Sequence, residues 1–81
     1  MDRTVKIIEI VRSISKKTTV PDRDESLFDS GYLDSFALPD MATELEAQFG
    51  IQIPDKDLNP RKFDTISSID RYIAQAVLSK A

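Results

Sequence analysis

Aliphatic side chains recur at helical spacing in three separate stretches of this 81-residue chain. Residues at i, i+3, i+4 and i+7 lie on one face of an α-helix, whereas strands alternate with a period of two. Each stretch therefore predicts a helix with one buried face, and the three faces predict an all-α fold around one aliphatic core. The three stripes are Ile7, Ile10, Val11 and Ile14; Met41, Ala42, Leu45 and Phe49; and Ile66, Ile69, Ile73 and Val77.

The ends of the helices are marked by residues with special backbone preferences. The first helix is expected over residues 2–16. The second is expected to run to Phe49, because Gly50 can adopt the left-handed conformation that ends a helix. The last helix is expected to begin after Asp64 or Thr65, either of which can cap it.

The connection between the first two helices is long, over residues 18–33, and contains Pro21 and Gly31. A loop of this length needs apolar anchors in a small domain, so Leu27 and Phe28 are expected to pin it to the core. A further short helical turn, containing Leu58, is expected over residues 55–60. The sequence thus predicts three main helices and a short one, third in chain order.

The composition limits what such a chain can do. Residues 1–81 are expected to form a single domain, which contains no Cys and no His. The usual zinc ligand sets are therefore excluded, and a serine has no histidine to activate it as a nucleophile. Because a bundle this small encloses no sizeable pocket, an enzyme is not expected. No apolar run approaches the length of a membrane span or an export signal, so a cytoplasmic protein is expected.

Charge is segregated along the chain. Residues 1–21 carry five Lys/Arg against two Asp/Glu, residues 22–57 carry two against ten, and residues 58–81 carry four against two. The acidic middle segment would repel nucleic acid and attract a basic enzyme surface. A merely solvated helix face explains such a run as well.

Ser35 follows Asp34 at the junction between the long loop and the second helix. The first backbone N–H groups of a helix are unpaired and carry partial positive charge. A phosphodiester on the Ser35 oxygen is therefore expected to sit beside these donors. The alternative is that Asp34 or Ser35 only caps the helix.

The order and spacing of several short motifs around this serine resemble the acyl and peptidyl carrier protein family over nearly the whole chain. That resemblance implies a four-helix bundle of the acyl-carrier type. The matching segments are Leu27-Phe28-Asp29, Gly31, Leu33-Asp34-Ser35-Phe36, Leu45-Glu46, Phe49-Gly50-Ile51, Ile53-Pro54 and Phe63-Asp64-Thr65-Ile66.

The resemblance implies a mechanism centred on Ser35. A phosphopantetheinyl transferase would move a 4'-phosphopantetheine arm from coenzyme A onto this serine. Acyl- or aminoacyl-loading and processing enzymes would then exchange cargo as a thioester on the arm, while the carrier itself performs no catalysis. Asp34 would support the serine and the magnesium bound to the transferase. Phe36, Asp40 and Glu44 would dock these partners, with Glu46 as a further candidate.

Two departures from fatty-acid carriers point to a specialised stand-alone carrier. Pro39 lies in the first turns of the second helix, so a late start near Pro39 or an irregular first turn is expected. The segment 53–65 is about two residues longer than in fatty-acid carriers, and its Arg61-Lys62 pair is unlike their acidic third helix. A fatty-acid, polyketide or nonribosomal-type pathway is expected, with a D-alanine or other aminoacyl carrier as the nearest sibling.

An unmodified, carrier-like adaptor that acts only through protein contacts is the alternative function. Pro39 favours it by altering the surface that modifying enzymes meet, whereas the intact Asp34-Ser35 pair argues against it. In either case the protein is expected to be a monomer, with no membrane insertion and no nucleic-acid partner.

Overall fold

The computed structural model describes residues 3–80, which form three α-helices and one short 3₁₀ helix. Helix α1 spans Arg3–Ser15, α2 spans Ala37–Phe49, η1 spans Asp55–Asp57 and α3 spans Ile66–Lys80. The described part of the chain contains no strand, which confirms the all-α fold with a short third helix. None of the helices within residues 3–80 is both long and apolar enough to cross a membrane.

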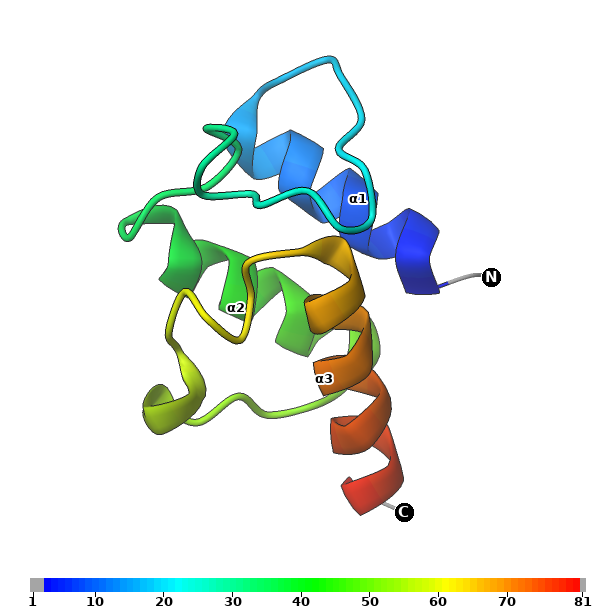
Figure 1. The fold of residues 1–81 in the computed structure, drawn as a ribbon. Coiled ribbons are helices and arrows are strands. Elements are labelled where there is room, and N and C mark those ends of the chain that lie inside the picture. Colours follow the sequence, from blue (N-terminus) through cyan, green and yellow to red (C-terminus); the bar gives the residue numbers. More distant parts are fainter. Residues whose placement is uncertain (1–2, 81) are drawn as a thin grey trace.

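Helix α1 packs against both α2 and α3 (Figure 1). It agrees with the helix predicted over residues 2–16, of which residue 2 lies outside the described residues. Lys16 leaves the helix with a φ of 59°. The chain then makes a wide loop above α1 and crosses back in front of it before it enters α2 (Figure 1). The segment 50–65 makes a wide arc through η1 before α3 begins.

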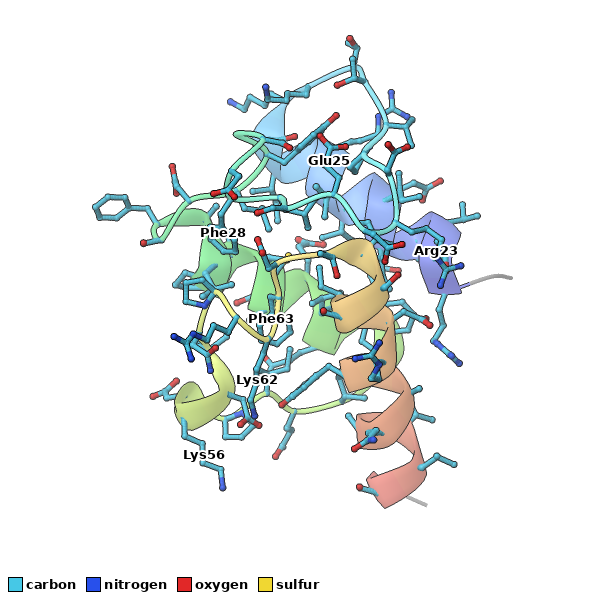
Figure 2. All side chains as sticks on the ribbon, in the orientation of Figure 1. Arg23, Glu25, Phe28, Lys56, Lys62 and Phe63 are labelled. Carbon is cyan, nitrogen blue, oxygen red and sulfur yellow. The ribbon has the colours of Figure 1, made fainter. Side chains whose placement is uncertain are left out.

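The predicted stripes form most of the core. The prediction that Val77 belongs to the buried stripe of the last helix is wrong, because this residue is 42% exposed. It lies near the C-terminal end of α3, which extends past the other helices (Figure 1). Leu38 is buried although no stripe predicted it. Phe63 lies at the centre of the bundle (Figure 2), among the fully buried side chains Ile7, Val11, Leu27, Leu45, Ile66, Ile69 and Ile73.

The long loop is anchored as predicted, by Leu27 in the core and by a partly buried Phe28. The Leu27 N–H donates to the Asp64 carbonyl at 2.6 Å, and the Ser26 hydroxyl donates to the Asp64 carboxylate at 2.6 Å. Gly31 has a φ of 82°, a conformation that side chains disfavour. The loop is therefore held both by packing and by hydrogen bonds to the residues that precede α3.

The helix ends follow the expected chemistry. Gly50 has a φ of 65°, and its N–H donates to the Glu46 carbonyl at 2.9 Å. At the start of α3, the Thr65 hydroxyl accepts the Ser68 N–H at 3.0 Å. Thr65 is therefore the cap, and Asp64 is occupied instead in binding the long loop.

The short third helix is shorter than the turn predicted over residues 55–60. η1 contains only three residues, and Leu58 follows it as a partly buried side chain against the core. Asn59 then begins a new turn, because its side-chain oxygen accepts the Lys62 N–H at 3.2 Å. Local side-chain hydrogen bonds of this kind compete with helix extension.

Candidate functional site

Asp34 caps the turn that leads into α2. One oxygen of its carboxylate accepts the N–H groups of Phe36 and Ala37, each at 2.9 Å. The Ala37 N–H also lies 3.1 Å from the Asp34 carbonyl oxygen, which closes a tight turn around Ser35. The predicted capping role therefore belongs to Asp34, and Ser35 is left out of the cap.

Ser35 is exposed at this turn. Its hydroxyl has no hydrogen-bond partner within the described part of the chain. The expected cradle of free N–H groups is not open, because Asp34 already occupies those of Phe36 and Ala37. A phosphate on Ser35 would be repelled by the Asp34 carboxylate. The site therefore fits a phosphodiester that points away from Asp34 into solvent, near the positive end of the α2 dipole.

Pro39 does not delay the start of α2. The helix begins at Ala37, so the predicted start near Pro39 is two residues too late. Pro39 is the third helical residue, where the backbone N–H of any residue would lack an intrahelical partner. The missing donor therefore costs no helical hydrogen bond. The predicted distortion of the first helical turn by a missing bond is also wrong, because the tight turn over residues 34–36 precedes the helix and is closed by Asp34.

Phe36, Asp40 and Glu44 follow one another at intervals of four residues, so they lie on one face at the start and along the length of α2. All three are exposed, and Phe36 reaches 90% exposure. Phe36 is therefore not a core residue. The Asp40 and Glu44 carboxylates form no ion pair within residues 3–80. We call these three residues the α2 stripe.

Glu46 does not belong to the α2 stripe. Its carboxylate accepts the Ile53 N–H at 2.8 Å, and its side chain is partly buried. Glu46 thus holds the extended segment after α2 against the helix. Glu46 therefore has a structural role, and its docking role stays a prediction.

The segment before Ser35 is stabilised by polar contacts that the sequence did not indicate. The Glu25 carboxylate accepts the Ser30 hydroxyl at 2.6 Å and the Asp22 N–H at 3.0 Å. The hydrogen bond from Ser30 is the main reason that the pKa of Glu25 is lowered. Thr19 and Tyr32 share a hydrogen bond of 2.6 Å between their hydroxyls. These contacts define the path of the loop into the turn at Ser35.

Comparison with known proteins agrees with this geometry. The model of the family described as "Phosphopantetheine attachment site" matches residues 5–73. The D-alanyl carrier protein of Streptococcus thermophilus (strain ATCC BAA-491 / LMD-9) is 32% identical over 69 residues, which cover 85% of this chain and 87% of that protein. The D-alanyl carrier protein of Streptococcus sanguinis (strain SK36) is also 32% identical, with the same coverage. That of Lactobacillus acidophilus is 29% identical, again with the same coverage.

The family match covers more than half of the chain and includes the turn at Ser35. Relatives above 30% identity cover most of its length. Carriers of this kind hold their cargo as a thioester on a covalently attached 4'-phosphopantetheine arm, and partner enzymes perform the chemistry. The chain belongs to the phosphopantetheine-attachment-site family and is a carrier protein, not an enzyme.

Proposed function

We propose that Ser35 carries the phosphopantetheine arm and that the cargo is D-alanine or another small aminoacyl group. The observation that carries the attachment proposal is the exposed Ser35 hydroxyl, left without a partner beside the Asp34 cap. A transferase can reach this oxygen without unfolding the turn. The names of the D-alanyl carrier relatives support the aminoacyl cargo.

The core supports a small cargo as well. Ile7, Leu45 and Ile69 are fully buried, and β-branched residues with restricted rotamers form much of the interior. A long acyl chain would have to displace such side chains to be sheltered. A small aminoacyl group remains outside on the arm and requires no such change. The proposal is therefore a dedicated aminoacyl pathway rather than fatty-acid or polyketide synthesis.

The attachment site is tested by intact-protein mass spectrometry after incubation with coenzyme A and a broad-specificity phosphopantetheinyl transferase. The wild-type chain is expected to gain one phosphopantetheine, and Ser35→Ala none. Ser13→Ala, an exposed serine of α1, is the matched control and is expected to be modified normally. Modification of Ser35→Ala would overturn the assignment. An unmodified, folded wild-type chain would instead favour the adaptor function.

The cargo is tested on the modified protein with the adenylating enzyme encoded nearest to it. D-Alanine, L-alanine, glycine and a medium-chain fatty acid are offered separately, and the mass of the loaded arm is measured. Preferential loading of D-alanine, released by hydroxylamine as a thioester, is expected. Preferential loading of the fatty acid would contradict the aminoacyl proposal without affecting the Ser35 assignment.

The α2 stripe is proposed as the surface that the transferase and the loading enzyme contact. Two unpaired carboxylates beside the exposed Phe36 would attract a basic surface with an apolar centre. Because coenzyme A and ATP are cytoplasmic metabolites, modification and loading place the protein in the cytoplasm. It acts there as a monomer that partners bind in turn.

Reversal of the stripe's charges tests this docking role. Asp40→Lys/Glu44→Lys is expected to lower kcat/KM for the transferase by about tenfold at low salt, and the difference is expected to shrink as salt rises. Asp24→Lys/Asp29→Lys is the control, because these exposed residues give the same change in net charge elsewhere. Equal loss in both variants would show general attraction rather than docking at α2.

A further inference from the structure

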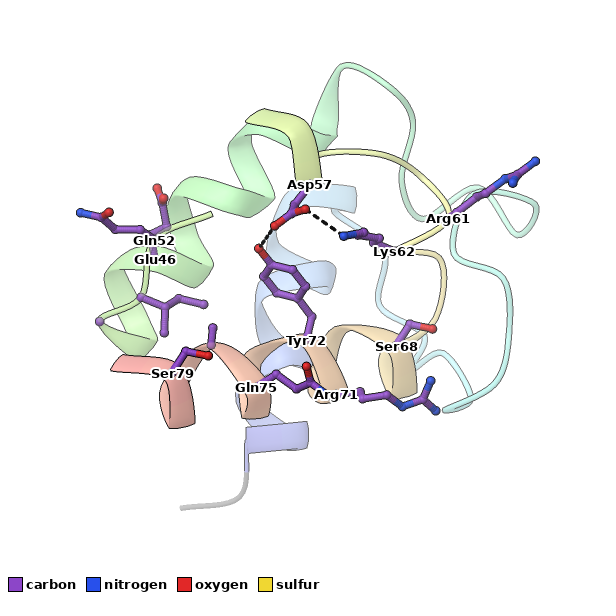
Figure 3. A pocket seen from close by; sticks show the side chains of 13 residues that line it. Glu46, Gln52, Asp57, Arg61, Lys62, Ser68, Arg71, Tyr72, Gln75 and Ser79 are labelled. Carbon is purple, nitrogen blue, oxygen red and sulfur yellow. Dashed lines mark hydrogen bonds and ion pairs between the residues drawn. The ribbon is translucent and has the colours of Figure 1, made fainter. Parts of the chain in front are cut away.

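A surface groove of about 950 Å³ is lined by the C-terminal end of α2, the segment around η1 and α3 (Figure 3). Its apolar lining comes from Ile51, Ala76 and the ring of Tyr72, and its amide groups come from Gln52 and Gln75. Neither Ser35 nor any residue of the α2 stripe lines the groove. It is therefore distinct from both the attachment site and the α2 stripe.

A hydrogen-bonded triad builds one wall of the groove. The Asp57 carboxylate accepts the Tyr72 hydroxyl at 2.7 Å and pairs with the Lys62 ammonium at 2.8 Å (Figure 3). The rings of Phe63 and Tyr72 pack with their centroids 5.1 Å apart. These contacts attach the arc containing η1 to α3, so the groove is a preformed feature of the fold.

The groove is lined by three cationic side chains, Arg61, Lys62 and Arg71, and by the carboxylates of Glu46 and Asp57, so its net charge is +1. Asp57 and Lys62 neutralise each other, and the Glu46 carboxylate binds the Ile53 N–H. Arg61 and Arg71 also line the groove, and both are exposed. Their guanidinium groups form no ion pair or hydrogen bond within residues 3–80.

The two arginines come from different elements on the same side of the groove, with Arg61 extending outward from the arc after η1 and Arg71 extending along α3 (Figure 3). An arginine binds a carboxylate through two parallel hydrogen bonds, which gives such a contact a defined geometry. Leu78 lies two turns after Arg71 on α3 and is 76% exposed. The groove thus offers cationic and amide contacts, and the exposed Leu78 adds an apolar contact on α3 beside the groove.

We propose that this groove is a docking site for an acidic segment of a partner protein. Carboxylates of that segment bind Arg61 and Arg71, and an apolar side chain covers Leu78. A protein segment can enter a concave groove and use its amide groups, whereas a membrane surface cannot. The partner must have the opposite charge to one that docks on the acidic α2 stripe, so the two surfaces select different partners. This proposal does not depend on the assignment of Ser35.

The test uses the full-length, isotopically labelled chain and a short synthetic peptide containing two glutamates and one leucine. The peptide is expected to shift the backbone amide NMR signals of Ile51, Ser68, Tyr72 and Gln75, and to bind more weakly as salt rises. A peptide with glutamines in place of the glutamates controls for its apolar part. It is expected to bind about tenfold more weakly.

Variants of the carrier separate a docking site from general attraction. Arg61→Glu/Arg71→Glu is expected to weaken binding of the glutamate peptide by at least about tenfold. Arg23→Glu/Lys56→Glu changes the net charge equally at exposed positions outside the groove, with Lys56 pointing away from the bundle (Figure 2). This control is expected to bind within about twofold of the wild type. Unchanged circular dichroism shows that each variant is folded.

Several results would overturn the proposal. Equal weakening in the two double variants, or shifts confined to α2, would show that the groove does not select the peptide. Preferential binding of phosphatidylglycerol vesicles through Arg61 and Arg71 would make a membrane the occupant. Self-association in sedimentation velocity that Arg61→Glu/Arg71→Glu abolishes would make a second copy of this chain the occupant.

Discussion

The Ser26 hydroxyl donates a 2.6 Å hydrogen bond to the Asp64 carboxylate across 38 residues of sequence. It joins the loop that precedes Ser35 to the residues that start α3. The adjacent bond from the Leu27 N–H to the Asp64 carbonyl strengthens the same junction. The position of the turn at Ser35 therefore depends on a contact with the segment that precedes α3.

Removal of this junction is expected to destabilise the fold. Ser26→Ala leaves the partly buried Asp64 carboxylate without its side-chain donor, which lowers the free energy of unfolding by about 1–3 kcal/mol. Urea unfolding measures the effect. The control Ser13→Ala, at an exposed position of α1, is expected to stay within about 0.5 kcal/mol of the wild type. Equal stability of the two variants would show that the contact contributes little.

Two substitutions at Asp34 distinguish its role as a hydrogen-bond acceptor in the turn from the effect of its negative charge. Asp34→Ala removes the acceptor of the Phe36 and Ala37 N–H groups and is expected to lower the free energy of unfolding by about 1 kcal/mol. Asp34→Asn keeps an oxygen acceptor and is expected to keep most of that stability. If Asp34 also supports the transferase, Asp34→Asn slows modification although the cap remains. Equal loss of stability in both variants would contradict the capping role.

Phe36 is expected to matter for partners and not for folding. Its side chain is 90% exposed, so Phe36→Ala is expected to change the free energy of unfolding by less than about 0.5 kcal/mol. The same variant is expected to lower kcat/KM of the transferase by about tenfold, since exposed aromatic side chains are typical interface anchors. Val20→Ala, with a side chain 57% exposed on the loop, is the matched control. A modification rate equal to that of the control would remove Phe36 from the docking surface.

Tyr72 gives the fold a pH dependence at alkaline pH. Burial, together with the hydrogen bond to Asp57, raises the pKa of Tyr72 to about 12. The pKa of Asp57 is lowered, mainly by its hydrogen bond with Lys62, so the acceptor stays charged. A raised pKa means that the fold favours neutral Tyr72. The resulting stability is fully present below about pH 10, the ordinary tyrosine pKa, and is lost as the pH rises toward 12.

Tyr72→Phe tests this dependence. The stability advantage of the wild type over Tyr72→Phe is expected to be constant below about pH 10 and to shrink above it. Urea unfolding at several pH values measures the advantage, and tyrosinate absorbance follows the ionisation directly. The late step of the absorbance titration is expected to vanish in Tyr72→Phe. A constant advantage up to pH 12 would contradict the role of the hydroxyl.

Local sequence determined the helical part of this protein. Helical periodicity and the capping residues depend on neighbours within about one turn, so the helix faces, Gly50 and the turn at Ser35 could be predicted. Two predictions about the start of α2 were wrong, because a second local arrangement satisfied the same residues. Pro39 fits inside the first turn of α2, and Asp34 fills the N–H groups that a phosphate was expected to use.

Only the tertiary structure decided which distant residues meet. The Ser26–Asp64 junction, the triad of Asp57, Lys62 and Tyr72, and the pairing of Glu46 with Ile53 all cross between segments. No periodicity marks such contacts, because each depends on how the loops pack against α3 or α2. The same packing neutralises Asp57 and leaves Arg61 and Arg71 unpaired at one groove. Sequence alone thus specified the helices and the candidate serine, whereas long-range packing decided which charges remain free to bind a partner.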